Sequence, residues 1–201
     1  VHEVKMVNQK AEVSGFISTY VINNKGVWVP KANFHNQIQW TWGEIACKLF
    51  GEGRPEYKIG GMYIEFENVA SPGDVVTPPS FDRSEGLEYY SALSASATRD
   101  YLRVQLISAP KSSLISGYEE ASVNVNQLTF FAQSSGSTGV NGKTFSAAAN
   151  STVYGVALVA MPKWENMSQD LIFAREYYPT AQQILKQASS QVGVSWTEQF
   201  K

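Results

Sequence analysis

An almost uninterrupted apolar run, STVYGVALVAMP, occupies residues 151–162. A strand on a protein surface alternates apolar and polar side chains, whereas a strand that is covered on both faces is apolar throughout. The run therefore predicts a central β-strand.

Other segments carry the shorter alternating patterns, rich in β-branched and aromatic residues, that are typical of strands. Residues 14–22 and 27–29 flank the turn residues NNKG and predict a hairpin. Further strands are predicted at 57–69, 99–109, 122–133, 170–178 and 191–196. Because strands and helices do not alternate, we expect a mainly β protein, an antiparallel, jelly-roll-like β-sandwich with one or two short helices.

A change of period at residues 37–50 predicts the first helix. Asn36 is a residue type that caps helix starts, and Gly51 stands where a left-handed C-terminal cap is expected. The apolar face of this helix consists of Ile38, Trp42, Ile45 and Leu49.

A second short helix is predicted at residues 180–189, where Thr180 and Gln183 have the spacing of a capping box.

The strand at 57–69 has a Gly60–Gly61 pair that predicts a bulge or bend. Its alternation predicts one buried and one solvated face. The buried face is Met62, Ile64 and Phe66, and the solvated face is Tyr63, Glu65 and Glu67.

Composition limits the classes of function. Charged residues make up 17% of the 201 residues, the net charge is −2, and the basic residues are scattered, so nucleic-acid binding is not expected. No apolar run is long enough to span a membrane, and the stretch VHEVKMVNQK at residues 1–10 lacks the apolar segment of a signal peptide. We expect residues 1–12 to form an arm and 13–201 a single domain. Cys47, the single cysteine, is expected to be a small buried residue on the first helix.

The stretch SSGSTGVNGKTF at 134–145 ends like a phosphate-binding loop. That loop requires a glycine five residues before Gly142, where the chain has Ser137. The following TFSAAANST is also too short for the helix whose N-terminus would face the phosphate. We therefore expect a flexible hairpin tip between two core strands, and no bound nucleotide.

No residue set predicts catalysis, a cofactor site or a metal site, so we do not expect an enzyme. Glu65 and Glu67 share a strand face, but alternation alone puts charged residues on a solvated face. Asp82 and Glu85 lack the spacing of a calcium loop, and His35 has no second metal ligand nearby.

Two long loops, at 70–86 and 134–150, are candidates for contacts with a partner protein. Trp40 is either a packing surface or an exposed ring for ligand stacking. The candidate contact residues in the loops are Pro72, Asp74, Pro78, Pro79, Phe81, Gly136, Gly139, Asn141 and Lys143.

Two stretches resemble small virion structural proteins of tailed bacteriophages, namely YGVALVAMPKWENMSQDLIFAREYY at 154–178 and SSQVGVSW at 189–196. A weaker resemblance is found in KIGGMYIEFEN at 58–68. The resemblance implies a β-sandwich that assembles with other copies of itself and docks on other virion proteins, and it carries over no catalytic residue. The low charge, polar arm and long loops agree with such an assembly protein.

The expected function is therefore a structural part of a phage particle. A tail, baseplate or fibre-attachment component is favoured over a capsid decoration protein, with the virion as its location. The alternative from a different class is a carbohydrate-binding β-sandwich used in host attachment.

Overall fold

A computed structural model describes residues 13–23, 25–35, 37–80, 82–107, 111–113, 127–134, 138–145, 150–186 and 190–200. In this part of the chain two antiparallel sheets pack face to face, which confirms the predicted β-sandwich. The predicted arm lies outside the described residues.

Sheet A has β1 and β11 near its middle, paired along their whole lengths. Its edge strand β2 contains Pro30, which has no N–H to donate and is therefore suited to an edge. The spatial order of sheet A is β2 (Trp28–His35), β1 (Val13–Ile22), β11 (Gln191–Phe200), β7 (Gln127–Gln133) and β6 (Lys111–Ser113).

Sheet B is built around β8, the apolar run identified in the sequence. β8 pairs with β4 on one side and with β9 and then β10 on the other. The spatial order is β3 (Gln37–Ile38), β9 (Leu171–Tyr177), β8 (Asn150–Ala160), β4 (Ile59–Val69) and β5 (Arg99–Gln105), with β10 (Ile184–Lys186) also beside β8.

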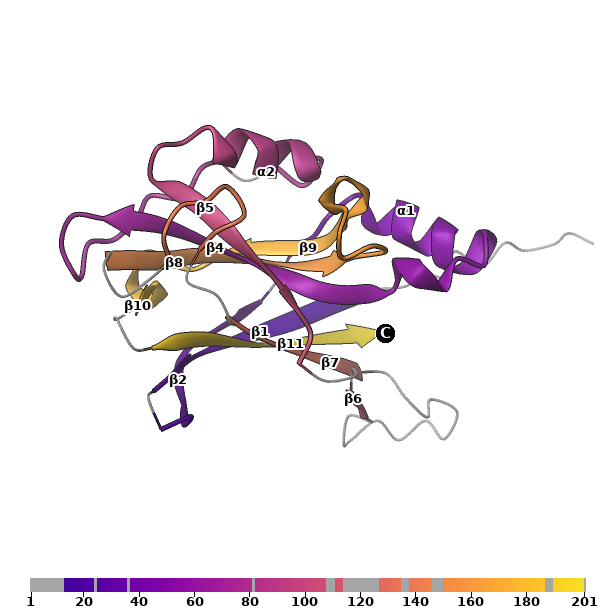
Figure 1. The fold of residues 1–201 in the computed structure, drawn as a ribbon. Helices are drawn as coiled ribbons and strands as arrows, with labels where there is room; N and C mark the ends of the chain where they lie inside the picture. The colour runs from indigo at the N-terminus through magenta and orange to yellow at the C-terminus, as the bar shows by residue number, and fades with distance from the viewer. Residues whose placement is uncertain are drawn as a thin grey trace, which may run out of the picture.

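Two hydrophobic clusters cover the two faces of sheet B. The first lies between the sheets and includes the fully buried Trp196 of β11. The second lies on the opposite face of sheet B under α2 (Leu87–Ser94), and Figure 1 shows α2 on the side of sheet B away from sheet A. Along β8, Val156 and Leu158 belong to the first cluster, and Ala157 and Val159 to the second. This double coverage explains why β8 is apolar on both faces and confirms its central place.

The predicted first helix begins later than expected. Residues 37–38 form β3, which pairs with β9, and helix α1 runs only over Trp42–Ala46 before a π-helical turn, η1 (Cys47–Gly51). The predicted apolar face is nevertheless correct, because Ile45 is buried and its three partners pack against the core. Ile38 packs against the core from a strand, and it would do the same from a helix. The apolar pattern of the sequence therefore could not distinguish a strand from a helix at this position.

Three further details of this segment differ from expectation. The left-handed glycine is Gly53, with φ of 64°, and not Gly51, because the π-helical turn extends the helix before it ends. Cys47 is exposed and not buried. The expected cap, Asn36, lies outside the described residues.

The second predicted helix is wrong. Thr180–Gln182 form one 3-10 turn, η4, and the chain then enters β10. Thr180 follows the N-cap position, where no side-chain cap is formed, and the Gln183 side chain instead bonds the backbone of Val76. Pairing with β8 thus outweighs the local helical pattern.

The remaining elements follow the sequence closely. The hairpin of β1 and β2 is present, the second strand being longer than predicted, and β4 has the predicted irregularity at Gly60–Gly61. The segment that follows the loop at 70–86 forms helix α2. Short 3-10 turns, η2 (Pro55–Tyr57) and η3 (Met167–Gln169), precede β4 and β9. No helix within the described ranges has the length and apolar character needed to cross a membrane.

Candidate functional site

The face of β4 predicted to be solvated is largely buried, and only Glu67 among its three residues stays half-buried. Tyr63 and Glu65 are both 0% exposed, because α2 and the loop at 70–86 cover this face of sheet B. The sequence pattern could not reveal this, since the cover comes from segments that follow β4 in the chain. Six tyrosines gather here, namely Tyr63, Tyr89, Tyr90, Tyr101, Tyr154 and Tyr177.

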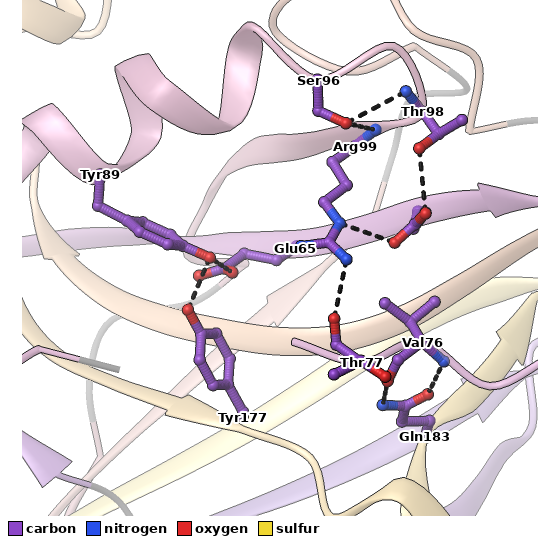
Figure 2. Close-up of polar contacts among 10 residues, drawn as sticks. Glu65, Val76, Thr77, Tyr89, Ser96, Thr98, Arg99, Tyr177 and Gln183 are labelled. Atoms are coloured by element: carbon purple, nitrogen blue, oxygen red, sulfur yellow. Dashed lines mark hydrogen bonds and ion pairs between the residues drawn. The ribbon is translucent and has the colours of Figure 1, made fainter. Parts of the chain in front are cut away.

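Glu65 lies at the centre of this tyrosine cluster. Its carboxylate accepts hydrogen bonds from the hydroxyls of Tyr89, at 2.7 Å, and Tyr90, at 2.8 Å, both on α2. Tyr177 of β9 in turn donates to the Tyr89 hydroxyl at 2.8 Å, as Figure 2 shows. Burial raises the pKa of the Glu65 carboxyl above its ordinary value, although Arg175 and the two hydroxyls oppose that shift.

Arg175 supplies the positive charge that acts most strongly on Glu65. Its guanidinium carbon lies 3.7 Å from the centre of the Tyr89 ring, and a guanidinium nitrogen lies 3.2 Å from the Glu85 carboxylate. Burial opposes its charge, but the surrounding tyrosines and Glu65 hold its pKa above the ordinary value. Arg175 therefore connects sheet B to the loop before α2.

A second buried carboxylate, Asp170, lies just before β9. Two guanidinium nitrogens of Arg103, on β5, donate hydrogen bonds to the Asp170 carboxylate at 2.6 and 2.9 Å, and the Tyr63 hydroxyl donates a further one. The Arg103 guanidinium also stacks 4.4 Å from the centre of the Trp164 ring. A buried arginine–carboxylate fork of this kind fixes two strands and a loop in one arrangement.

Arg99, at the start of β5, ties the loop to the sheet (Figure 2). It donates to Glu67 at 2.7 Å and to the carbonyl oxygen of Thr77 at 2.8 Å. Glu67 also accepts a hydrogen bond from Thr98.

Open hollows lie on two sides of Arg99. One, of about 510 Å³, lies between α2 and the loop and includes Glu85, Glu88 and Pro79. The other, of about 620 Å³, lies along the end of β4 and includes Glu67, Asp74 and Val75. Both hollows lie beside the tyrosine cluster, but Glu65 itself is closed off from them by its complete burial.

A third buried carboxylate, Asp100, explains the glycine-rich stretch. The segment 138–145, which we name the strap, folds over Asp100 with a bridge between Thr138 and Thr144. The backbone N–H groups of Asn141, at 2.9 Å, and Lys143, at 3.3 Å, donate to the Asp100 carboxylate. The Asn141 side-chain amide adds a bond at 2.9 Å.

The strap corrects the expectation of a flexible hairpin tip. β7 and β8 belong to different sheets, so the segment crosses from one sheet to the other and does not close a hairpin. Phe145 is fully buried and packs on Phe66, with ring centres 4.8 Å apart. Two backbone N–H groups of the strap, those of Asn141 and Lys143, do bind an anion, but that anion is the side chain of Asp100 and not a phosphate.

The candidate contact residues are distributed around the molecule. Gly139 is buried against Asp100, whereas Asn141 and Pro72 are exposed. Asp74 is exposed and accepts from the backbone of Ser71, and Pro79 lines the hollow beside α2. Pro78 and Lys143 are half-buried. Phe81 and Gly136 lie outside the described residues. Trp40, in the turn before α1, is 71% exposed.

Sequence reasoning missed the pairs that organise the buried face, namely Glu65 with the α2 tyrosines, Arg175 with Glu85, and Arg103 with Asp170. The available signal was the density of tyrosines in the segments that flank the loop at 70–86. Across the described segments, no three histidine, cysteine, aspartate or glutamate side chains are grouped so that they could hold a metal ion.

Comparison with known protein families, curated proteins and solved structures found no match to this chain.

Proposed function

We propose that this chain is a structural protein of a tailed bacteriophage particle, which assembles with other copies of itself and docks on other virion proteins. A tail, baseplate or fibre-attachment component is the favoured position. A capsid decoration protein is the alternative within the same class. The proposal of a phage protein rests on the resemblance at 154–178 and 189–196. The large apolar side chains exposed on the surface support a role in assembly.

The observation that carries the proposal is the exposure of large apolar side chains around α1. Trp40, before the helix, is 71% exposed, and Phe50, in η1, is 81% exposed. Rings of this size contribute most to protein interfaces when they become buried, and they contribute nothing to this chain's own core.

The buried charged groups favour a structural over a catalytic role. An enzyme would place a carboxylate of raised pKa where a substrate reaches it. The pKa of Glu65 is raised, but the side chain is 0% exposed and its oxygens already accept two tyrosine hydroxyls. Asp100 and Asp170 are likewise buried and bonded within the chain.

The test combines solution mass with particle imaging. Light scattering of the purified full chain should give a mass of at least twice 22.2 kDa, the mass of one chain. Labelled antibodies should bind at the tail end of particles of the phage that encodes the chain. A strictly monomeric chain that is absent from the particles would contradict the proposal.

A carbohydrate-binding function is the second candidate, because an exposed tryptophan is also a surface on which a sugar ring stacks. Binding on a glycan array that is lost in Trp40→Ser, together with a monomeric mass, would favour it over assembly.

A further inference from the structure

Strand β5 forms one of the two edges of sheet B. β5 pairs with β4 on one side, and on its other side no strand of the described residues pairs with it in this sheet. An edge strand presents unpaired N–H and C=O groups that can pair with an edge of another molecule, and proteins commonly cover or interrupt such edges.

The outward backbone groups of β5 are identified by two contacts at Tyr101. Its C=O accepts from the N–H of Val140, at 3.0 Å, and its N–H donates to the Asp100 carboxylate, at 2.8 Å. Alternate residues of an antiparallel strand point their backbone groups to the same side, so those of Arg103 and Gln105 also point away from β4.

This edge is covered at both ends. Beyond Gln105 the chain reaches sheet A, where Leu106 bridges Ala132 and the N–H of Ile107 donates to Phe131 at 2.9 Å. At the other end the N–H of Arg99 donates to the hydroxyl of Ser96. Between these ends the strap covers the edge at Tyr101.

One side chain holds the strap at this place. The Asp100 carboxylate accepts three hydrogen bonds from Asn141 and Lys143, and Val140 then reaches the Tyr101 carbonyl. Gly139 is required for the close approach, because a Cβ there would overlap the Asp100 carboxylate. The strap is therefore latched on the strand that it covers.

We propose that the strap prevents strand pairing at the β5 edge of sheet B, and that releasing the strap from Asp100 lets two copies of the chain pair through β5. The occupant is a second copy, because each released copy presents the same edge and two such edges pair antiparallel about a two-fold axis. The inference concerns the free chain and does not depend on its having a role in a virion.

The test uses the full chain with Asp100→Asn, which keeps the shape of the side chain but replaces one acceptor oxygen by an amide nitrogen. Hydrogen exchange followed by NMR should show the Val140 amide exchanging at least tenfold faster than in the wild type. Light scattering should show a mass that rises with concentration to twice the wild-type value. At high concentration the amides of Tyr101 and Arg103 should become more protected as the edges pair.

A second variant, Gly139→Ala, displaces the strap while keeping the carboxylate, and it should give the same results if Asp100→Asn does not fold. Asp82→Asn is the control, because Asp82 is an exposed aspartate that is hydrogen-bonded to Ser84. It should change neither measurement. Unchanged exchange at Val140 in the folded variants would show that Asp100 does not hold the strap in place. Faster exchange without a concentration-dependent mass would show that the strap does not prevent two copies from pairing through β5. Both outcomes are read against the wild type, so they are distinct from failure of the wild-type chain to assemble.

Discussion

Glu65 shows how far one residue's environment depends on distant parts of the chain. Its neighbours in the strand suggest a solvated carboxylate, but its partners, Tyr89, Tyr90 and Arg175, come from α2 and β9. A carboxylate in such a place is stabilised by hydrogen bonds and by the nearby positive charge, yet burial still favours its neutral form.

Replacing this carboxylate should alter the pH dependence of stability. The folded-state pKa of Glu65 is raised above its unfolded value, so its contribution is most favourable below the unfolded pKa and is lost as pH rises through the folded pKa. Glu65→Gln should remove this loss. The variant should therefore gain stability relative to the wild type as pH rises from about 4.5, the ordinary glutamate value.

Urea unfolding of both proteins from acidic to neutral pH measures the difference. Glu44→Gln, an exposed carboxyl in α1, serves as the control, and its difference from the wild type should stay small throughout. A constant difference between Glu65→Gln and the wild type would show that Glu65 does not titrate in this way.

Two glycines, Gly61 and Gly43, differ in how much space surrounds them. A Cβ at Gly61 would overlap the carbonyl oxygen of Val104 and the side chain of Met161, whereas one at Gly43 would meet no atom within 4 Å. Gly61→Ala should destabilise the fold by about 1–3 kcal/mol through overpacking. Gly43→Ala should be neutral or stabilise it by up to about 1 kcal/mol through helix propensity. Chemical denaturation compares the two, and equal effects would contradict the described packing.

At the scale of elements, the loop at 70–86 is fixed by side chains rather than by regular secondary structure. Gln183 accepts from the N–H of Val76 at 2.8 Å and donates to its C=O at 2.6 Å, much as a neighbouring strand would (Figure 2). Arg99 holds Thr77 a residue further on. The loop thereby covers the tyrosine cluster without forming a strand of its own.

Gln183→Ala should release this loop. Both backbone groups of Val76 would lose their partner in a half-buried place, at a cost of about 1–3 kcal/mol. Limited proteolysis and hydrogen exchange should show faster opening of the segment around Val76. Thr180→Ala is the matched control: no side-chain cap forms at this turn, so the change should cost less than about 0.5 kcal/mol. A larger cost for Thr180→Ala than for Gln183→Ala would favour the capping box that the sequence suggested.

At the scale of the whole molecule, sheet B separates two hydrophobic clusters, and the large exposed side chains lie outside both. The residues that stabilise the chain are therefore different from those proposed to bind other copies. Assembly and folding should be separable by mutation.

The double substitution Trp40→Ser with Phe50→Ser should test this separation. Both rings are mostly exposed, so the free energy of unfolding of the isolated chain should change by less than about 1 kcal/mol. The mass in solution should fall toward that of one chain. Retention of the wild-type mass by the folded double variant would remove α1 from the proposed interface.

The sequence was most informative where one pattern had one structural meaning. The run at 151–162 predicted a central strand, the NNKG turn predicted the β1–β2 hairpin, and Gly60–Gly61 predicted an irregularity in β4. It was least informative where a helix and a strand place the same side chain inward, as at Ile38 and in β10.

The sequence by itself determined the class of the fold, because apolar periodicity and turn residues are local properties that the chain carries into any arrangement. Only the tertiary structure decided that Glu65, Asp100 and Asp170 are buried, and that the glycine-rich stretch is held on Asp100. The reason is that each of these carboxylates is bound by a group that is distant in the chain. Tyr89 lies 24 residues from Glu65, Asn141 lies 41 residues from Asp100, and Tyr63 lies 107 residues from Asp170. A carboxylate has the same place in a local pattern whether water or such a partner satisfies it.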